Sequence, residues 1–181
     1  MGGLLDVPPP GTRALPSSTV ATAPPIDVEI TDMADETRSL SEWLTTFPLA
    51  LVVVDPFTYE SSWILDTAVR LFGEYSQADV RLAFLVTTDA GGTRSFLGPL
   101  TEQALAFADP DRSLVRALEL DTLPALVVIR QDGELVGVAE GWDPDAWRQV
   151  TESMSDLLGW HRPAIPGPGD PVAYPGTPAL P

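Results

Sequence analysis

A carboxylate and several hydroxyl groups follow one another in the segment that begins at Asp55. Ser61 and Ser62 lie in the same predicted loop as this aspartate. A serine becomes a nucleophile only when a base is positioned beside it. The chain has a single histidine, His161, and it stands at the edge of a proline-rich stretch far along the sequence. We therefore predict no catalytic residue.

Asp55 closes the apolar run 49–54, and two interpretations of its carboxylate stay open. It can end a strand and accept hydrogen bonds from amides of the following turn. It can instead form a polar site beneath the loop, in a cleft with Thr58, Ser61 and Pro124. The second interpretation would make the chain a thiol-independent enzyme or a small-molecule binder.

The chain contains no cysteine, which excludes disulfides, thiolate metal sites and thiol nucleophiles. Two carboxylate pairs, in 109–111 and 143–145, each flank a proline. They fit helix starts better than calcium sites, because negative charge stabilises a helix N-terminus. The glycine-rich stretch 89–99 lacks the spacing and the lysine of a phosphate-binding loop, so we predict an ordinary loop there. We predict neither a metal nor a cofactor.

The formal net charge of −16 is concentrated in the middle of the chain, because only Asp6 and Asp170 of the 26 acidic residues lie near the ends. Such a surface repels phosphate backbones and anionic lipids, which argues against nucleic acid and membrane partners. No secretory signal is visible at the start, and the longest apolar run, 47–54, is too short to span a bilayer. We predict a cytoplasmic protein without membrane insertion. The use of arginine with no lysine suggests a bacterial genome of high GC content.

Apolar patterning predicts an α/β domain over residues 27–160. The continuous apolar run 49–54 is typical of a central strand covered on both faces, and Asp132-Gly133 between two apolar runs predicts a hairpin. Segments with helical spacing alternate with the strands, which favours a central mixed sheet flanked by helices. The expected strands are 26–30, 49–54, 80–88, 124–129 and 134–140; the expected helices are 37–47, 61–75, 109–119 and 143–158; residues 101–107 fit a helical turn or a short strand.

Proline-rich stretches lie on both sides of this domain. Six of the 19 prolines fall in residues 1–26 and seven in residues 161–181. Proline donates no main-chain hydrogen bond and interrupts regular structure. We predict both stretches to be disordered tails. If they thread onto other chains, the protein is a subunit of a larger complex, which is an alternative function.

The order of the predicted elements, with a proline opening the terminal hairpin, resembles the thioredoxin fold. No single motif carries this resemblance, and the ordered set covers roughly residues 27–160. The matching features are an apolar strand that ends in an acid, the proline-containing strand, the hairpin turn, and a glycine before the last helix. They are found at Leu51–Asp55, Asp121–Leu126, Asp132–Glu134 and Gly141.

The resemblance carries implications for individual residues. It implies that Pro124 is cis and that Asp55 matches the buried acid that assists the resolving cysteine of thioredoxins. The segment 106–118 is similar to the peroxiredoxin and TlpA-like branch of the superfamily. A further resemblance, to HyaE-like hydrogenase accessory proteins, rests on Ser41–Leu44 and Leu123–Leu126.

Thiol chemistry needs a thiolate, so the resemblance implies a redox-inactive protein. In thioredoxin-like proteins the main chain before the cis-proline pairs with an extended peptide, which requires only backbone donors and acceptors. We therefore predict that the chain binds another protein, as an assembly factor, chaperone or adaptor. The loop aromatics are either core or, if exposed, an apolar contact patch. The predicted binding surface consists of Phe57, Thr58, Tyr59, Ser61, Ser62, Trp63, Thr122, Leu123 and Pro124.

Overall fold

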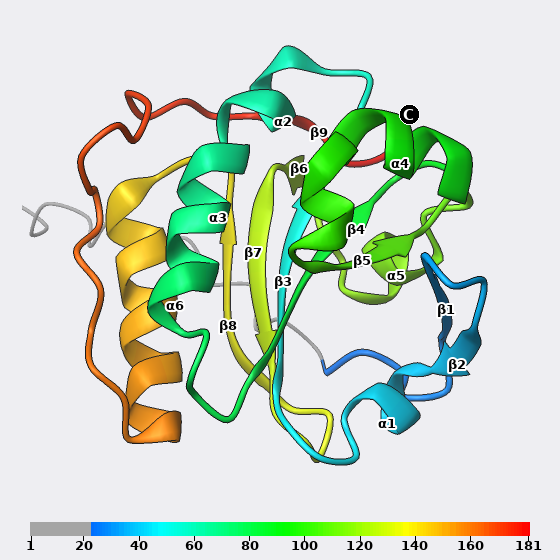
Figure 1. Ribbon diagram of the computed structural model, residues 1–181, viewed down its shortest axis with the longest axis horizontal. Coiled ribbons are helices and arrows are strands. Elements are labelled where there is room, and N and C mark those ends of the chain that lie inside the picture. Colours follow the sequence, from blue (N-terminus) through cyan, green and yellow to red (C-terminus); the bar gives the residue numbers. More distant parts are fainter. Residues whose placement is uncertain (1–22) are drawn as a thin grey trace, which may run out of the picture.

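The computed structural model describes residues 23–181, in which a mixed β-sheet is flanked by helices, as the sequence predicted (Figure 1). Most of the N-terminal tail predicted for residues 1–26 lies outside the described residues. The main sheet has seven strands in the order β2-β1-β5-β4-β3-β7-β8. These strands are β1 (Glu29–Asp32), β2 (Thr37–Ser39), β3 (Leu49–Val54), β4 (Arg81–Val86), β5 (Leu105–Ala108), β7 (Ala125–Ile129) and β8 (Leu135–Glu140).

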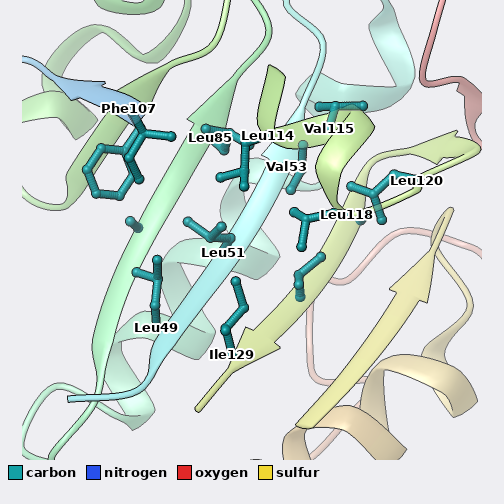
Figure 2. Packing of buried hydrophobic residues seen from close by; sticks show 14 of the residues in the cluster. Leu49, Leu51, Val53, Leu85, Phe107, Leu114, Val115, Leu118, Leu120 and Ile129 are labelled. Atoms are coloured by element: carbon teal, nitrogen blue, oxygen red, sulfur yellow. The ribbon is translucent and has the colours of Figure 1, made fainter. Parts of the chain in front are cut away.

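Strand β3 organises the sheet because all six of its residues are apolar and buried. It pairs in parallel with β4 and antiparallel with β7. Leu49, Leu51 and Val53 point into one core cluster, shown in Figure 2, and the residues that alternate with them pack into a second cluster on the opposite face. Each fully buried aliphatic side chain contributes about 1.5–3 kcal/mol relative to exposure. The central strand therefore fixes both layers of the core.

Helices cover both faces of the sheet. They are α1 (Leu40–Trp43), α2 (Tyr59–Trp63), α3 (Leu65–Glu74), α4 (Ala90–Leu97), α5 (Ser113–Ala117) and α6 (Pro144–Leu158), with a 3-10 helix, η1, at Gly98–Glu102. Helices α1 and α5 contribute to the cluster of Figure 2, and α3, α4 and α6 contribute to the other. The apolar faces read from helical spacing are thus the faces that pack on the sheet.

Three predicted helices are shorter than expected or divided. The helix expected over 109–119 is reduced to α5 at Ser113–Ala117. The helix expected over 37–47 is divided into β2 and α1, because Ser39 and Glu42 form a capping box that starts the helix at residue 40. The helix expected over 61–75 is divided at Ile64 into α2 and α3. At the start of α1 the capping box therefore outweighs the apolar periodicity.

The stretch 89–99, which we expected to be a loop, contains helix α4. The side chain of Asp89 accepts a hydrogen bond from the Gly92 N–H at 2.7 Å and so caps the first turn. This cap offsets the low helix propensity of the two glycines in that turn. The ambiguous segment 101–107 ends in a strand, β5, which begins at Leu105.

Residues 161–181, hereafter the C-terminal segment, correct the prediction of a disordered tail. The segment runs beside α6 and then across one end of the sheet (Figure 1, orange to red). Ile165 and Ala179 are buried in the two core clusters. Thr177–Pro178 form strand β9, which pairs with β6 (Thr122–Leu123) in a separate two-stranded sheet.

The prolines themselves explain how this segment is held without regular structure. Proline has no N–H, so a proline-rich chain presents carbonyl acceptors with few donors of its own. The domain provides the donors from three arginines and one indole. The donor residues and the carbonyls that accept from them are Arg70 with Ala164, Arg148 with Ile165, Trp142 with Pro171 and Arg112 with Ala179.

Asp170 anchors the middle of the C-terminal segment. Its carboxylate accepts hydrogen bonds from Arg70 at 2.7 Å, from the Thr67 hydroxyl at 2.8 Å and from the Gly167 N–H at 2.6 Å. The Asp170 side chain is only 2% exposed. A charge at this depth is tolerated because it is paired and fully hydrogen-bonded.

We expect Asp170→Ala to lower the free energy of unfolding by about 3 kcal/mol, because it leaves the largely buried guanidinium of Arg70 and the hydroxyl of Thr67 without their partner. Urea denaturation followed by tryptophan fluorescence measures this change. Asp156→Ala is the matched control, since Asp156 forms an exposed ion pair with Arg162 whose loss should matter little. Equal effects of the two substitutions would contradict the packing of the C-terminal segment.

Candidate functional site

The loop after β3 folds back onto the end of that strand through hydroxyl groups. Ser61 is fully buried, and its Oγ accepts a hydrogen bond from the Asp55 N–H at 2.9 Å. The hydroxyl of Thr58 donates to the same oxygen at 3.2 Å. Ser62 is exposed and donates to the carbonyl of Tyr59 at 2.7 Å. These hydroxyls shape the loop and do not line an open cleft.

The histidine lies in another part of the molecule. The Nε2 of His161 forms a hydrogen bond with the carboxylate of Glu74 at 2.8 Å, and its ring stacks against Tyr75 with centroids 6.4 Å apart. Within residues 23–181 neither Ser61 nor Ser62 has a histidine partner. Ser61 therefore has no histidine positioned to activate it.

Asp55 combines the predicted turn contact with an ion pair that the sequence did not reveal. One carboxylate oxygen accepts a hydrogen bond from the Phe57 N–H at 2.9 Å. The other accepts from Arg112 at 2.9 Å, and the two side chains are 8% and 15% exposed. Arg112 also donates to the carbonyl of Ala179. The proposed polar site beneath the loop is thus occupied by the protein's own guanidinium.

The aromatic residues after β3 are exposed. Phe57 lies in the loop, whereas Tyr59 and Trp63 lie in the short helix α2 and not in the loop that the sequence predicted. Phe57 is 79% exposed, Tyr59 81% and Trp63 52%. The indole of Trp63 also packs edge-on against Tyr174 of the C-terminal segment, with ring centroids 5.3 Å apart. These three side chains are therefore not core residues, and their role as a contact patch stays a prediction. We refer to these three residues as the aromatic patch.

We expected the main chain before Pro124 to be open to a partner, but in the structure it is paired with another strand of the same chain. The Leu123–Pro124 peptide bond is cis, as the resemblance implied. However, Thr122 and Leu123 already pair with β9, so their backbone edge is covered. The side chain of Leu123 is buried in the core. The sequence missed this because no pattern in a proline-rich stretch indicates which edge it will pair with.

Tyr174 joins the C-terminal segment to the loop. Its hydroxyl donates to the carbonyl of Glu60 at 2.6 Å, and its main chain forms a bridge with Trp142. Burial, with a smaller contribution from the Glu60 carboxylate, raises the pKa of Tyr174 well above its ordinary value. The phenol is therefore held in its neutral, donating form.

The predicted acidic pairs act at helix starts. The Asp109 carboxylate accepts main-chain hydrogen bonds from Ser113, Leu114 and Val115 at the start of α5. Burial raises the pKa of Asp109, although these three amides oppose the shift. Asp143 caps α6 in the same way. Among residues 23–181 no cluster of three or more histidine or acidic side chains could hold a metal ion.

No known family model and no curated protein matches the sequence. Solved structures do resemble it. A protein named as the thiol:disulfide interchange protein DsbE of Chlorobium tepidum aligns with a TM-score of 0.64 and 14% identity, over 77% of this chain and 97% of that one. Peroxiredoxin Q of Xanthomonas campestris aligns with a TM-score of 0.58 and 11% identity, over 74% and 90%. The fold is thioredoxin-like.

A third similar structure is a secreted Mycobacterium tuberculosis disulfide oxidoreductase homologous to E. coli DsbE, with a TM-score of 0.55 and 16% identity over 74% of this chain and 96% of that one. At such identities the thioredoxin-like fold is what is shared. The three similar proteins are named for redox chemistry, whereas this chain has no cysteine. None of them is a hydrogenase accessory protein, so the HyaE-like resemblance stays a prediction.

None of the helices within residues 23–181 has the length and apolar character needed to cross a bilayer. The cytoplasmic location stays a prediction, as does the bacterial origin of this chain.

A double-mutant cycle tests the ion pair beneath the thioredoxin-like loop. We expect Asp55→Ala and Arg112→Ala each to lower the free energy of unfolding by about 3 kcal/mol, because each leaves a largely buried charge unpaired. The double variant should lose less than the sum, with a coupling energy of about 2 kcal/mol. The exposed pair Arg130 and Asp132 serves as the control and should show much weaker coupling. Strictly additive effects at Asp55 and Arg112 would contradict the pairing.

We expect Tyr174 to make the fold sensitive to alkaline pH. Because the folded state favours its neutral form, its stabilisation is complete below about pH 10 and is lost as the pH rises toward the higher pKa of the folded protein. Tyr174→Phe should flatten the fall in melting temperature above about pH 10. Burial also raises the pKa of Tyr75, so this residue should contribute to the slope that remains. An unchanged slope in the variant would contradict this role of Tyr174.

Proposed function

We propose that this thioredoxin-like protein acts by binding another protein and not by thiol chemistry. The observation that carries the proposal is the exposure of Phe57 and Tyr59, about 80% each, in the loop and at the start of α2 after the central strand. Both side chains stand on a backbone that the Asp55 and Ser61 hydrogen bonds fix from below. A hydrogen-bonded backbone that presents large, exposed apolar side chains is typical of a protein contact site.

Aromatic residues suit this role because they bury a large area while losing little side-chain entropy. The formal charge of −16 adds a second feature of the partner. An acidic protein associates faster with a surface that carries a basic rim, and such steering weakens as salt rises. We therefore expect a partner with an apolar centre and basic surroundings, in an assembly, chaperone or adaptor role.

The alternative of a small-molecule site or a thiol-independent enzyme has less support. Both oxygens of Asp55 and the hydroxyl of Ser61 have hydrogen-bond partners within the protein. A ligand would have to displace Arg112 or the loop amides to reach them. The exposed aromatic patch requires no such rearrangement before it binds.

Site-specific photocrosslinking in the native cell tests the proposal. A photoreactive phenylalanine analogue at position 57 or 59 should capture one predominant protein. The same analogue at position 172 is the matched control, because Val172 is 90% exposed but lies outside the aromatic patch. Once the partner is purified, Phe57→Ala together with Tyr59→Ala should weaken binding by about 30-fold or more.

Circular dichroism and the melting temperature show whether these variants keep the fold, and little change is expected because both side chains are exposed. Crosslinks that are equally diverse at positions 57, 59 and 172 would contradict a recognition role for the aromatic patch.

A further inference from the structure

The edge of β6 is the place where the C-terminal segment behaves as a bound peptide. Thr122 lies opposite Pro178 and Leu123 lies opposite Thr177 in antiparallel register. The ladder continues at one end, where the Ala179 N–H donates to the carbonyl of Asp121 at 2.8 Å. Figure 1 shows β9 laid against β6 at the end of the sheet. This is main-chain recognition of an extended segment.

Two positions of the segment admit only small residues. Gly176 has a φ of +81°, and a β-carbon there would lie 2.4 Å from the carbonyl oxygen of Leu123. Ala179 is fully buried within the core cluster that includes Leu114 and Leu118. By contrast, Pro178 is exposed. The β6 edge therefore selects glycine and, three positions later, a small residue. The exposed position just before that small residue is not restricted.

Arg112 adds a polar contact to this selection. It donates to the carbonyl of Ala179 while it pairs with Asp55 beneath the aromatic patch. Tyr174, at the other end of the paired stretch, packs against Trp63 of the patch. The β6 edge and the aromatic patch are thus neighbouring parts of one surface.

In thioredoxin-like proteins the main-chain edge before the cis-proline pairs with an extended peptide. We infer that in this chain residues 176–181 are a resident occupant of that edge, and that only a segment with glycine and, three positions later, alanine can take their place. The inference rests on the proposed function, since it names the kind of segment that the partner inserts. A partner segment of this pattern replaces β9, and the chain's own segment competes with it. The site is therefore regulated by its own sequence.

The strength of the competition between β9 and a partner segment depends on how closely β9 is tethered to β6. Asp170 and the bridge between Trp142 and Tyr174 hold the segment upstream, so a released β9 stays close to β6. The effective concentration of such a tethered occupant is on the order of millimolar. A peptide with an intrinsic dissociation constant of about 10 µM would then bind the wild-type chain about 100-fold more weakly than a chain whose own β9 is displaced.

Gly176→Ala in the full chain tests this inference with a fluorescent peptide that copies residues 176–181. The substitution should displace β9, because the new β-carbon collides with the Leu123 carbonyl. Fluorescence anisotropy should then show binding about 100-fold tighter than to the wild-type chain. Gly169→Ala is the matched control: its φ of +83° imposes similar strain, but its β-carbon meets no atom within 4 Å. The control should bind like the wild type.

Hydrogen exchange at the Ala179 amide shows directly whether β9 has left. An amide that exchanges rapidly in Gly176→Ala, with no binding of the peptide up to about 1 mM, would overturn the inference. An amide that stays protected would overturn it as well, because glycine would not be required. A peptide that carries the same Gly176→Ala change should fail to bind.

The crosslink from position 57 separates this inference from the proposed function. If the peptide fails to bind while the crosslink persists in Gly176→Ala, the inference about the β6 edge is wrong and the proposed function of the aromatic patch is kept. If the peptide binds while no specific crosslink forms, the inference about the β6 edge is kept and the proposed function of the aromatic patch is wrong.

Discussion

The ion pair between Asp55 and Arg112 connects three parts of the chain that are distant in sequence. Asp55 ends the central strand, Arg112 precedes α5, and the second bond of Arg112 reaches the carbonyl of Ala179. Arg112 adopts a left-handed backbone with φ of 54°, which costs a non-glycine residue about 1–2 kcal/mol. The hydrogen bonds of its guanidinium offset this cost. The loop, the helix and the C-terminal segment therefore depend on one buried contact.

The fold could be predicted because its main signals are local. The apolar run of β3, the Asp-Gly turn before β8 and the caps of α5 and α6 each act within a few residues. The exposure of the aromatic patch stayed open, since Phe57, Tyr59 and Trp63 are as apolar as core residues. Only the surrounding packing decides on which side of a loop such residues lie.

The sequence could not predict that the C-terminal segment packs on the domain, and the reason here is different. Its stability comes from side-chain donors such as Arg70 and Trp142, which lie far away in sequence. Proline content indicates what a segment cannot form by itself, but it carries no information about donors on the domain. The pairing of Asp55 with Arg112 was hidden in the same way, because the two residues are 57 positions apart.

Gly141 of the domain lies close to the C-terminal segment, and this close approach bears on which other sequences could hold such a segment. A β-carbon at this position would lie 2.6 Å from the carbonyl oxygen of Pro175, so any other residue would push the segment away. Glycine at this position and at Gly176, with arginine at Arg112, therefore allows β9 to lie against β6 in this chain. In another thioredoxin-like chain, a larger residue at either glycine position would predict that this edge is not covered by the chain's own segment.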